Sequence, residues 1–200
     1  MRHPIILAAL LAGPLAAAGI AAAAPPDPRP NVPVDDVDLS CYAGTWYEQA
    51  HLPMVFQRQC VSDTTARYRL QADGTVEVLN RCRTREGGFE QARGVARTVH
   101  GRTSTLEVRF APAWLSWLPV VWGDYWVIAL DEADYRWAMV GAPDADYLWI
   151  LSRTPQLAPA VRARLVEQAR AMGYPVDELI ETPQRSQAPA GQAAEPAPAQ

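Results

Sequence analysis

The chain has 200 residues with 18 basic and 22 acidic side chains, which gives a net charge of −4 at pH 7. Hydrophobic residues make up 49% of it, enough for one domain with a buried core. The acidic balance argues against a nucleic-acid-binding surface, and three His and three Cys leave little material for a metal site.

The N-terminal segment has the features of a secretory signal peptide. Residues 5–18 are apolar and follow a weakly basic start, and the small residues at 18–24 suit signal peptidase. A retained membrane helix is the alternative, but Gly13-Pro14 interrupts the run and a Pro-rich stretch follows it. We therefore assign residues 1–24 to a signal peptide. No cysteine lies immediately after the cleavage region, so we expect an exported protein, periplasmic or associated with the outer membrane, without a lipoprotein attachment site.

Composition divides the rest of the chain into three parts. Residues 25–37 are rich in Pro and Asp, which indicates an extended linker. Residues 184–200 are mostly Ala, Pro and Gln, which predicts a disordered tail. We expect residues 38–183 to form the folded domain.

Within that domain, short β-branched and aromatic runs alternate with turn residues, which predicts strands. One helix follows, opened by Thr154-Pro155 and stopped by Gly173 and Pro175, and its apolar stripe needs a sheet to pack on. Eight strands at short, even spacing favour an all-β up-and-down antiparallel barrel, or a sandwich, with the α-helix packed outside. The expected strands are residues 44–51, 62–70, 75–83, 89–99, 104–110, 124–131, 135–141 and 147–152.

Export places the three cysteines in an oxidising compartment. Cys60 and Cys82 flank the hairpin turn signal Asp73-Gly74, so we predict that they form a disulfide. A regular register would set Cys60 opposite residue 85, so the pairing needs a bulge or a diagonal approach. Cys41 is then a buried or partly buried free thiol, although a bridge from it to either of the others stays open.

Three motifs stand in order along the chain: Gly44-Thr45-Trp46-Tyr47-Glu48, then Gly123-Asp124-Tyr125-Trp126-Val127, then the segment from Tyr147 to Pro155 with Arg153 before the helix. Together they resemble the signatures of the lipocalin family, in the form typical of bacterial outer-membrane lipocalins and their apolipoprotein D-like relatives. The resemblance covers roughly residues 37–182. It implies an eight-stranded barrel with one open mouth, one closed end and a ligand cavity inside.

The first and third motifs have a physical role at the closed end. Trp46 is a large, flat plug, and the Arg153 guanidinium can lie over its face while capping backbone carbonyls. Gly44 allows a close turn there. We therefore expect Gly44, Trp46 and Arg153 to be structural residues.

Strand parity predicts the cavity wall, because successive side chains point to opposite faces. The wall is mainly apolar, with a few hydroxyls and one carboxylate, and suits an acyl chain or another elongated apolar ligand. The alternative is that these side chains fill the lumen, since an eight-stranded barrel is narrow. The expected ligand-binding residues are Glu48, Ala50, Phe56, Ala66, Tyr68, Val78, Asn80, Ala92, Gly94, Leu106, Val108, Tyr125, Val127, Tyr147 and Trp149.

The predicted function is binding of a fatty acid or lysophospholipid for transport, storage or scavenging in the cell envelope, by a monomer or weak homodimer, with no cofactor. A lipocalin-type enzyme acting on a lipid or isoprenoid is one alternative. A protein-interaction module that uses the Trp-rich loop of residues 111–122 is another.

The apolar segment 111–122 supports a second kind of contact. It is uncharged and contains Trp114, Leu115, Trp117, Leu118 and Trp122. Loops are usually polar, and tryptophan favours the membrane–water interface. We expect peripheral membrane contact here; the alternatives are that the segment folds back over the barrel or buries a dimer contact.

Catalysis has little support in the sequence. His51 and His100 lack a partner at metal-ligand spacing, and neither Gly-x-Ser-x-Gly nor a phosphate loop is present. Glu48 is the one carboxylate that parity turns inward, where it could bind a polar head group. A hydrogen bond to backbone at the closed end is the interpretation we favour. We predict no catalytic residues and no enzyme.

Overall fold

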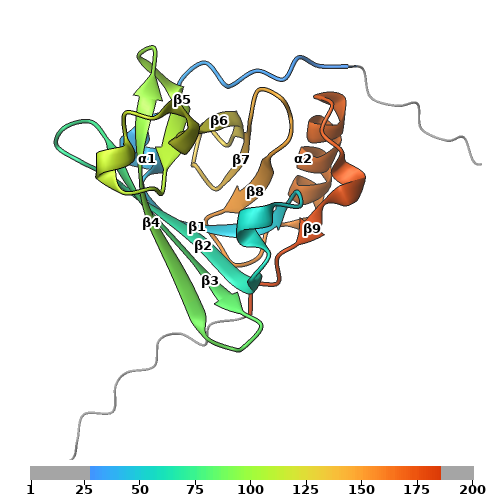
Figure 1. Ribbon diagram of the computed structural model, residues 1–200. Helices are drawn as coiled ribbons and strands as arrows, with labels where there is room; N and C mark the ends of the chain where they lie inside the picture. The colour runs from blue at the N-terminus through green and yellow to red at the C-terminus, as the bar shows by residue number, and fades with distance from the viewer. Residues whose placement is uncertain (1–27, 186–200) are drawn as a thin grey trace, which may run out of the picture.

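Eight strands follow one another along the chain, and each pairs antiparallel with its sequence neighbour (Figure 1). The computed structural model describes residues 28–185. Pairing of the first strand with both the second and the eighth closes the sheet into a barrel. The strands are β1 (Gly44–His51), β2 (Cys60–Leu70), β3 (Val76–Thr84), β4 (Phe89–Val99), β5 (Arg102–Arg109), β6 (Gly123–Leu130), β7 (Trp137–Gly141) and β8 (Leu148–Ser152).

The alternation of apolar residues predicted these strands closely. The first and fourth have the predicted bounds, and every other strand end lies within two residues of its predicted position. The β2–β3 turn forms at Asp73-Gly74, where Gly74 adopts a φ of +82° that favours glycine. The barrel, and not the sandwich, is the fold.

The register of β2 and β3 contains the irregularity that the cysteine positions require. Pairing runs regularly from Leu70 to Thr65, then shifts twice, so that Cys60 lies opposite Thr84. These shifts bring the Cα atoms of Cys60 and Cys82 to 5.5 Å, and the predicted disulfide is present. Cys41 is a free thiol, as expected, but it is exposed and not buried.

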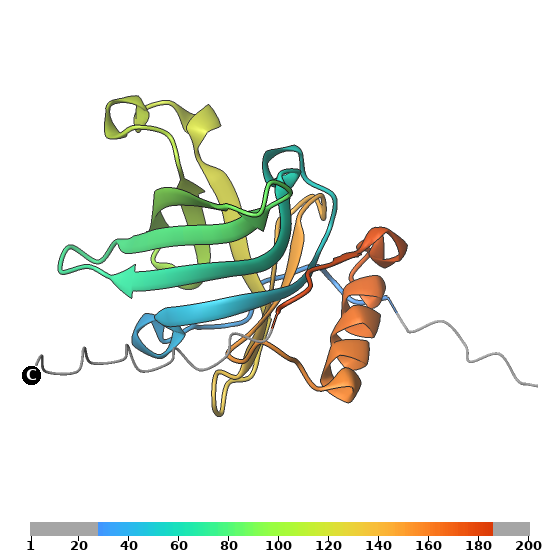
Figure 2. The same cartoon turned by 90° about the horizontal axis from the view of Figure 1, so that it is seen from below.

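The helix begins later than predicted. Helix α2 (Pro159–Ala171) starts after Ala158, whose ψ of 130° is extended. A residue before proline avoids the helical conformation, so Pro159 sets the start, whereas Thr154-Pro155 lies in a bend before it. Helix α2 packs against one side of the barrel, and residues 111–122 project on the side away from it (Figure 2).

Two apolar cores result from this arrangement. One lies inside the barrel around Trp46, Val127 and Leu151. The second lies between the barrel and α2, where Leu165 and Ala169 meet outward-facing side chains of the strands. The lumen and the helix interface are therefore separate packing layers.

The described residues of the predicted linker and of the predicted tail both contact the barrel. Residues 28–37 lie along it, with the Val34 amide donating to the Val127 carbonyl and Val37 buried. The short helix α1 (Leu39–Tyr42) follows, capped by the Asp38 carboxylate.

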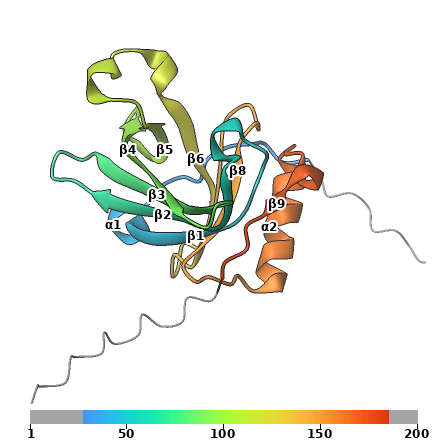
Figure 3. The ribbon, with the colours of Figure 1, turned by 60° about the horizontal axis from the view of Figure 1, so that its bottom comes forward.

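At the other end of the described chain, β9 (Ile180–Glu181) pairs with β1 and runs between β1 and α2 (Figure 3). The Gln184 amide donates to the Glu48 and Thr64 carbonyls, and the Arg185 backbone amide donates to the Asp63 carboxylate. The folded part therefore extends to residues 184 and 185, which we had assigned to the tail. The predicted signal peptide and residues 186–200 lie outside the described residues.

Candidate ligand-binding cavity

The lumen contains a cavity of about 520 Å³. Ligand pockets of proteins commonly measure about 300–1,000 Å³, so the side chains leave room for a small molecule. Thirteen of the fifteen predicted residues lie on its wall, eleven of them in strands, Phe56 in the β1–β2 loop and Tyr147 directly before β8. They are Glu48, Phe56, Ala66, Tyr68, Val78, Asn80, Ala92, Leu106, Val108, Tyr125, Val127, Tyr147 and Trp149.

Ala50 is a wrong prediction. It lies in the core between barrel and helix, beside Ile150 and Leu165, and not in the lumen. The pairing of β1 with β8 shifts register between Glu48 and Ala50. A bulge adds one residue and reverses the face of every residue beyond it, which parity alone cannot foresee.

Gly94 is a second wrong prediction. Its position on β4 points inward, but a Cβ there would lie 2.7 Å from the Arg109 carbonyl oxygen and 2.8 Å from the Phe110 ring. Phe110 therefore occupies the lumen in front of Gly94 and forms the wall in its place. The glycine allows this close approach.

Residues from outside the regular strands complete the wall, and the strand pattern did not reveal them. Val37, Leu39 and Tyr42 come from the N-terminal segment and α1, and Gln57 and Gln59 come from the β1–β2 loop. The Cys60–Cys82 disulfide also lines the cavity. Alternation along the strands carries no signal for the residues of the N-terminal segment and the β1–β2 loop, because they lie outside the strands.

Three tyrosine hydroxyls form a chain in the cavity wall. Tyr42 and Tyr125 lie 2.9 Å apart, and Tyr125 donates to Tyr68 at 2.9 Å. Burial raises the pKa of Tyr68 to about 12 and the pKa values of Tyr42 and Tyr125 well above their usual 10. The three groups therefore stay protonated at neutral pH. Three protons serve two hydrogen bonds, so one O–H remains without a tyrosine acceptor.

Glu48 lies in a buried polar cluster on the same wall. Its carboxylate accepts hydrogen bonds from Gln57 Nε2 at 2.7 and 2.8 Å and from Thr182 Oγ1 at 2.5 Å. His51 Nε2 is 3.9 Å away. The prediction that Glu48 binds backbone at the closed end is wrong, because its partners come from the β1–β2 loop and the C-terminal segment. These partners tie both segments to β1.

The charge state of Glu48 gives a stability prediction. Burial raises its pKa above the ordinary 4.5, and the nearby His51 and the hydrogen bonds only partly oppose this. A raised native pKa favours the folded state below the ordinary pKa, and this contribution is lost as pH rises through the native pKa. The free energy of unfolding of the wild type, relative to Glu48→Gln, should therefore fall as pH increases from about 4 toward 8 in urea titrations.

An exposed carboxylate supplies the control for that experiment. Glu132 lies in the β6–β7 turn and forms no ion pair with the described residues. The difference between wild type and Glu132→Gln should stay flat over the same range. A difference for Glu48→Gln that is constant or rises with pH would contradict the predicted burial effect.

The closed end has the geometry that the motifs indicated. The Arg153 guanidinium carbon lies 3.9 Å from the centre of the Trp46 ring, and Trp46 is fully buried. Arg153 donates to the carbonyls of Cys41, Tyr42, Thr45 and Tyr135. Gly44 has a φ of +102°, and a Cβ there would lie 3.2 Å from the guanidinium. Arg153 thus joins α1, β1 and the β6–β7 turn beneath the cavity.

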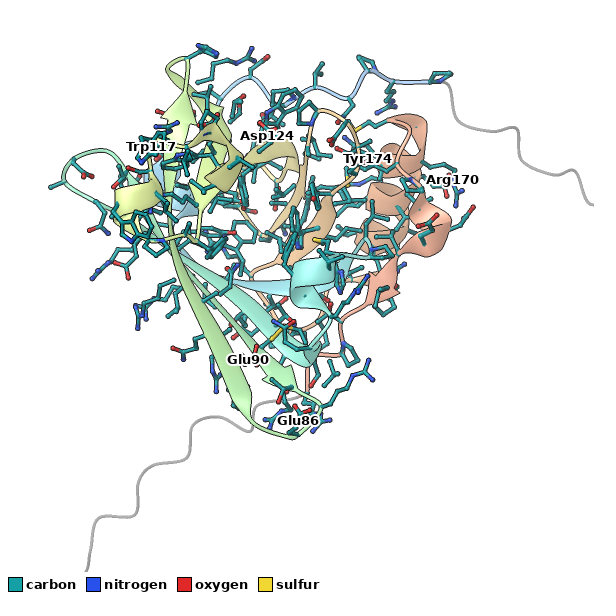
Figure 4. The ribbon with its side chains drawn as sticks, in the orientation of Figure 1. Glu86, Glu90, Trp117, Asp124, Arg170 and Tyr174 are labelled. Atoms are coloured by element: carbon teal, nitrogen blue, oxygen red, sulfur yellow. A yellow bond between two sulfur atoms is a disulfide. The ribbon has the colours of Figure 1, made fainter. Side chains whose placement is uncertain are left out.

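The segment 111–122 has two different faces. Trp114 and Trp117 are 73% and 74% exposed, and Figure 4 labels Trp117 in this loop. Leu115, Leu118 and Trp122 are partly buried. The Trp122 ring lies 3.9 Å from the Arg97 guanidinium carbon on the outer wall. The five predicted contact residues therefore separate into an exposed pair and a supporting set.

The described residues contain no group of three His, Cys, Asp or Glu side chains arranged to hold a metal ion. None of their helices is long and apolar enough to cross a membrane. His100 lies in the β4–β5 turn, and His51 contacts only Glu48 among the carboxylates of the described residues.

A closed antiparallel barrel with an outer helix and an apolar lumen defines a class of small-ligand-binding proteins. A family model described as a lipocalin-like domain matches residues 37–184. The chain belongs to the lipocalin family, and its cavity is consistent with the binding of a small hydrophobic ligand.

Relatives occur in plants, bacteria and animals. The chain is 38% identical to temperature-induced lipocalin-1 of Arabidopsis thaliana, over 78% of this chain and 84% of the relative. It is 36% identical to the outer membrane lipoprotein Blc of Vibrio cholerae, over 76% and 86%. It is 30% identical to apolipoprotein D of Mus musculus, over 78% and 82%. The predicted resemblance to the bacterial outer-membrane and apolipoprotein D-like lipocalins is confirmed.

Solved structures show the same fold. Insecticyanin from the tobacco hornworm Manduca sexta superposes with a TM-score of 0.60 at 24% identity, covering 80% of this chain and 88% of that one. At this identity the likeness concerns the fold alone.

Proposed function

We propose that the protein binds a single-chain lipid, a fatty acid or a lysophospholipid, and carries, stores or scavenges it in the cell envelope without chemical conversion. The observation that carries the proposal is the apolar cavity of about 520 Å³ inside the barrel. Burial of an acyl chain there contributes about 0.8 kcal/mol per CH₂.

The polar groups of the wall support a tail-first orientation. Glu48 is acidic, and the tyrosine chain deeper in the lumen is neutral. Arg81 is the one basic residue of the wall, and its guanidinium carbon lies 3.4 Å from the centre of the Phe89 ring. An acidic head group thus has little to pair with inside the cavity. We infer that the head group stays at the mouth, in water, with the acyl chain in the lumen.

Filling the lumen tests the proposal. Ala66 lines the cavity, and Ala66→Trp places an indole where the chain would lie. Loss of about four methylene contacts corresponds to about a 200-fold weaker Kd. Fatty-acid and lysophospholipid titrations of the exported protein, followed by native mass spectrometry, measure this.

The matched control is Ala163→Trp on the exposed face of α2, which should bind as the wild type does. Equal affinity of all three proteins would overturn the cavity proposal. Bound lipid should be recovered chemically unchanged, and recovery of a converted product would favour the enzyme instead.

We further propose that residues 111–122 bring the mouth to a membrane. The exposed side chains of Trp114 and Trp117, with Val120 beside them, give this loop an apolar tip, and exposed apolar patches of this kind mark contact sites. Membrane contact fits a role in lipid uptake in the envelope, the location that we infer from the predicted signal peptide.

Replacing both exposed tryptophans with serine should weaken liposome binding about 100-fold or more, because two indoles no longer enter the interface. Liposome flotation of Trp114→Ser/Trp117→Ser against wild type measures this. Ile180→Ser, at an exposed apolar residue of β9, is the control and should bind as the wild type does. Undiminished flotation of the double variant would count against membrane contact. So would a wild-type dimer in solution that the double variant no longer forms, because the tryptophans would then lie in a dimer interface.

A further inference from the structure

The outer surface of β2–β5 is basic although the whole protein is acidic. Seven arginines lie there, alternating along the strands with residues that line the lumen. Asp63, Glu77 and Glu107 are the carboxylates in ion-pair distance of them. This wall therefore carries a net positive charge against −4 for the chain. The arginines are Arg67, Arg69, Arg81, Arg83, Arg93, Arg97 and Arg109, of which Arg81 also borders the cavity.

Arg109 differs from the others because it is buried without a counter-ion. It is 8% exposed, and its Nε has no hydrogen-bond partner. It donates to the Ala111 carbonyl and lies 5.2 Å from the Trp122 ring, but no described carboxylate comes within ion-pair distance. A buried charge is costly unless it is paired. Arg109 therefore has the capacity to bind an anion.

A hollow of about 400 Å³ adjoins Arg109 on this wall. Arg93 lies on its rim, and Ala111 and Ala113 of the loop form another side. Glu77 also lines the hollow. Its carboxylate forms an ion pair with Arg69 and a second with Arg93, whose guanidinium nitrogen is 3.4 Å away. Two arginines, Arg93 and Arg109, against the one carboxylate of Glu77 leave the hollow positive.

The hollow is continuous with the exposed tip of the loop. Ala113 borders the hollow, and the next residue is Trp114, which is exposed. Tryptophan settles at the level of the lipid head groups, so a bilayer entered by Trp114 presents its phosphates next to Arg93 and Arg109. Arginine is suited to phosphate because its planar guanidinium can donate two hydrogen bonds.

We propose that the hollow lined by Arg93 and Arg109 binds the phosphate of an anionic phospholipid at the bilayer surface. The proposal rests on the membrane contact proposed for residues 111–122. It adds a preference for lipid charge, because the tryptophans alone do not distinguish anionic from zwitterionic bilayers.

The test compares vesicles of phosphatidylcholine with vesicles of phosphatidylcholine and phosphatidylglycerol, using the exported full chain. Arg93→Gln/Arg109→Gln should weaken binding to the phosphatidylglycerol vesicles about 30-fold at low salt and leave binding to phosphatidylcholine unchanged. Arg93→Gln alone changes an exposed side chain and should give part of the loss without affecting the fold.

Arg67→Gln is the matched control, because Arg67 is exposed on the same wall and lies outside the hollow. Equal losses for Arg67→Gln and Arg93→Gln would show diffuse attraction and overturn the site. Inorganic phosphate should compete only weakly. If the hollow binds inorganic phosphate but the protein shows no preference for phosphatidylglycerol vesicles, the hollow is a site for a free oxyanion. That outcome would overturn the lipid assignment.

The outcomes separate the two proposals. Binding to both vesicle types that is lost on Trp114→Ser/Trp117→Ser, but without a preference for phosphatidylglycerol, refutes the phosphate site and keeps the membrane contact. Failure of the wild type to bind either vesicle refutes both.

Discussion

Replacing Trp46 with alanine is expected to lower the free energy of unfolding by about 3–5 kcal/mol, the range for removal of a large buried aromatic side chain. The indole is fully buried under the cavity, donates to the Tyr42 carbonyl at 2.8 Å and supports the Arg153 guanidinium. Its removal leaves a void at the closed end and a half-buried cation without its aromatic partner. Urea titration monitored by circular dichroism measures the loss.

Two variants bracket this prediction. Trp46→Phe keeps a ring beneath Arg153 but loses the indole hydrogen bond, so it should cost less than Trp46→Ala. Trp114→Ala removes an indole that is 73% exposed and should change stability by less than about 0.5 kcal/mol. Similar losses for Trp46→Ala and Trp114→Ala would contradict a closed end built on Trp46.

Removal of the disulfide is expected to cost about 3 kcal/mol. Cys60 and Cys82 are separated by 22 positions, and chain entropy of the unfolded state gives this magnitude for a loop of that length. The bridge also fixes the end of the β1–β2 loop against β3 at the cavity wall. Cys60→Ser/Cys82→Ser should therefore unfold at lower urea concentration, and the wild type under reducing conditions should match it.

Cys41 supplies the control within the same chain. It is exposed and free, and its thiol contacts only the Asp38 carboxylate, at 3.5 Å. Cys41→Ser should leave the urea midpoint unchanged. A midpoint shift for Cys41→Ser as large as that for the double variant would mean that the disulfide is not the source of the stability.

The strands could be predicted because their physical signal is local. Tyr68 and Val78 face the lumen, and Arg67 and Arg69 face solvent, as alternation requires. The disulfide could be predicted because the chain has only three cysteines. The stacking of Arg153 on Trp46 could be predicted from the first and third motifs. The fold and most of the cavity wall were therefore available from the sequence.

The errors arise where distant contacts decide a local structure. The bulge in β1 that turns Ala50 toward α2 depends on pairing with β8, about 100 residues away in the chain. The position of Glu48 depends on Gln57 and Thr182, and the docking of residues 28–37 depends on β6. Alternation within one strand carries no information about these partners.

Proline chemistry explains the remaining boundary error. The predicted helix start is Thr154-Pro155, but the helix begins at Pro159. The Ser152 hydroxyl donates to the Thr154 carbonyl and the Thr154 hydroxyl donates to the Gln156 carbonyl, which holds residues 152–156 in a bend. The helix therefore begins only at Pro159.

The C-terminal segment determines the order in which the fold can be completed. Strands β1 and β2 pair directly only from Gly44 to Tyr47, and beyond that point the Gln184 amide bridges the Glu48 and Thr64 carbonyls across the seam. These contacts span 136 and 120 residues, and contacts of such long range slow folding. A chain synthesised from its N-terminus holds all eight barrel strands before this bridge exists. The gap between β1 and β2 beyond Tyr47 therefore closes only when the end of the domain is present. Until then these strand edges are accessible to chaperones or to other chains.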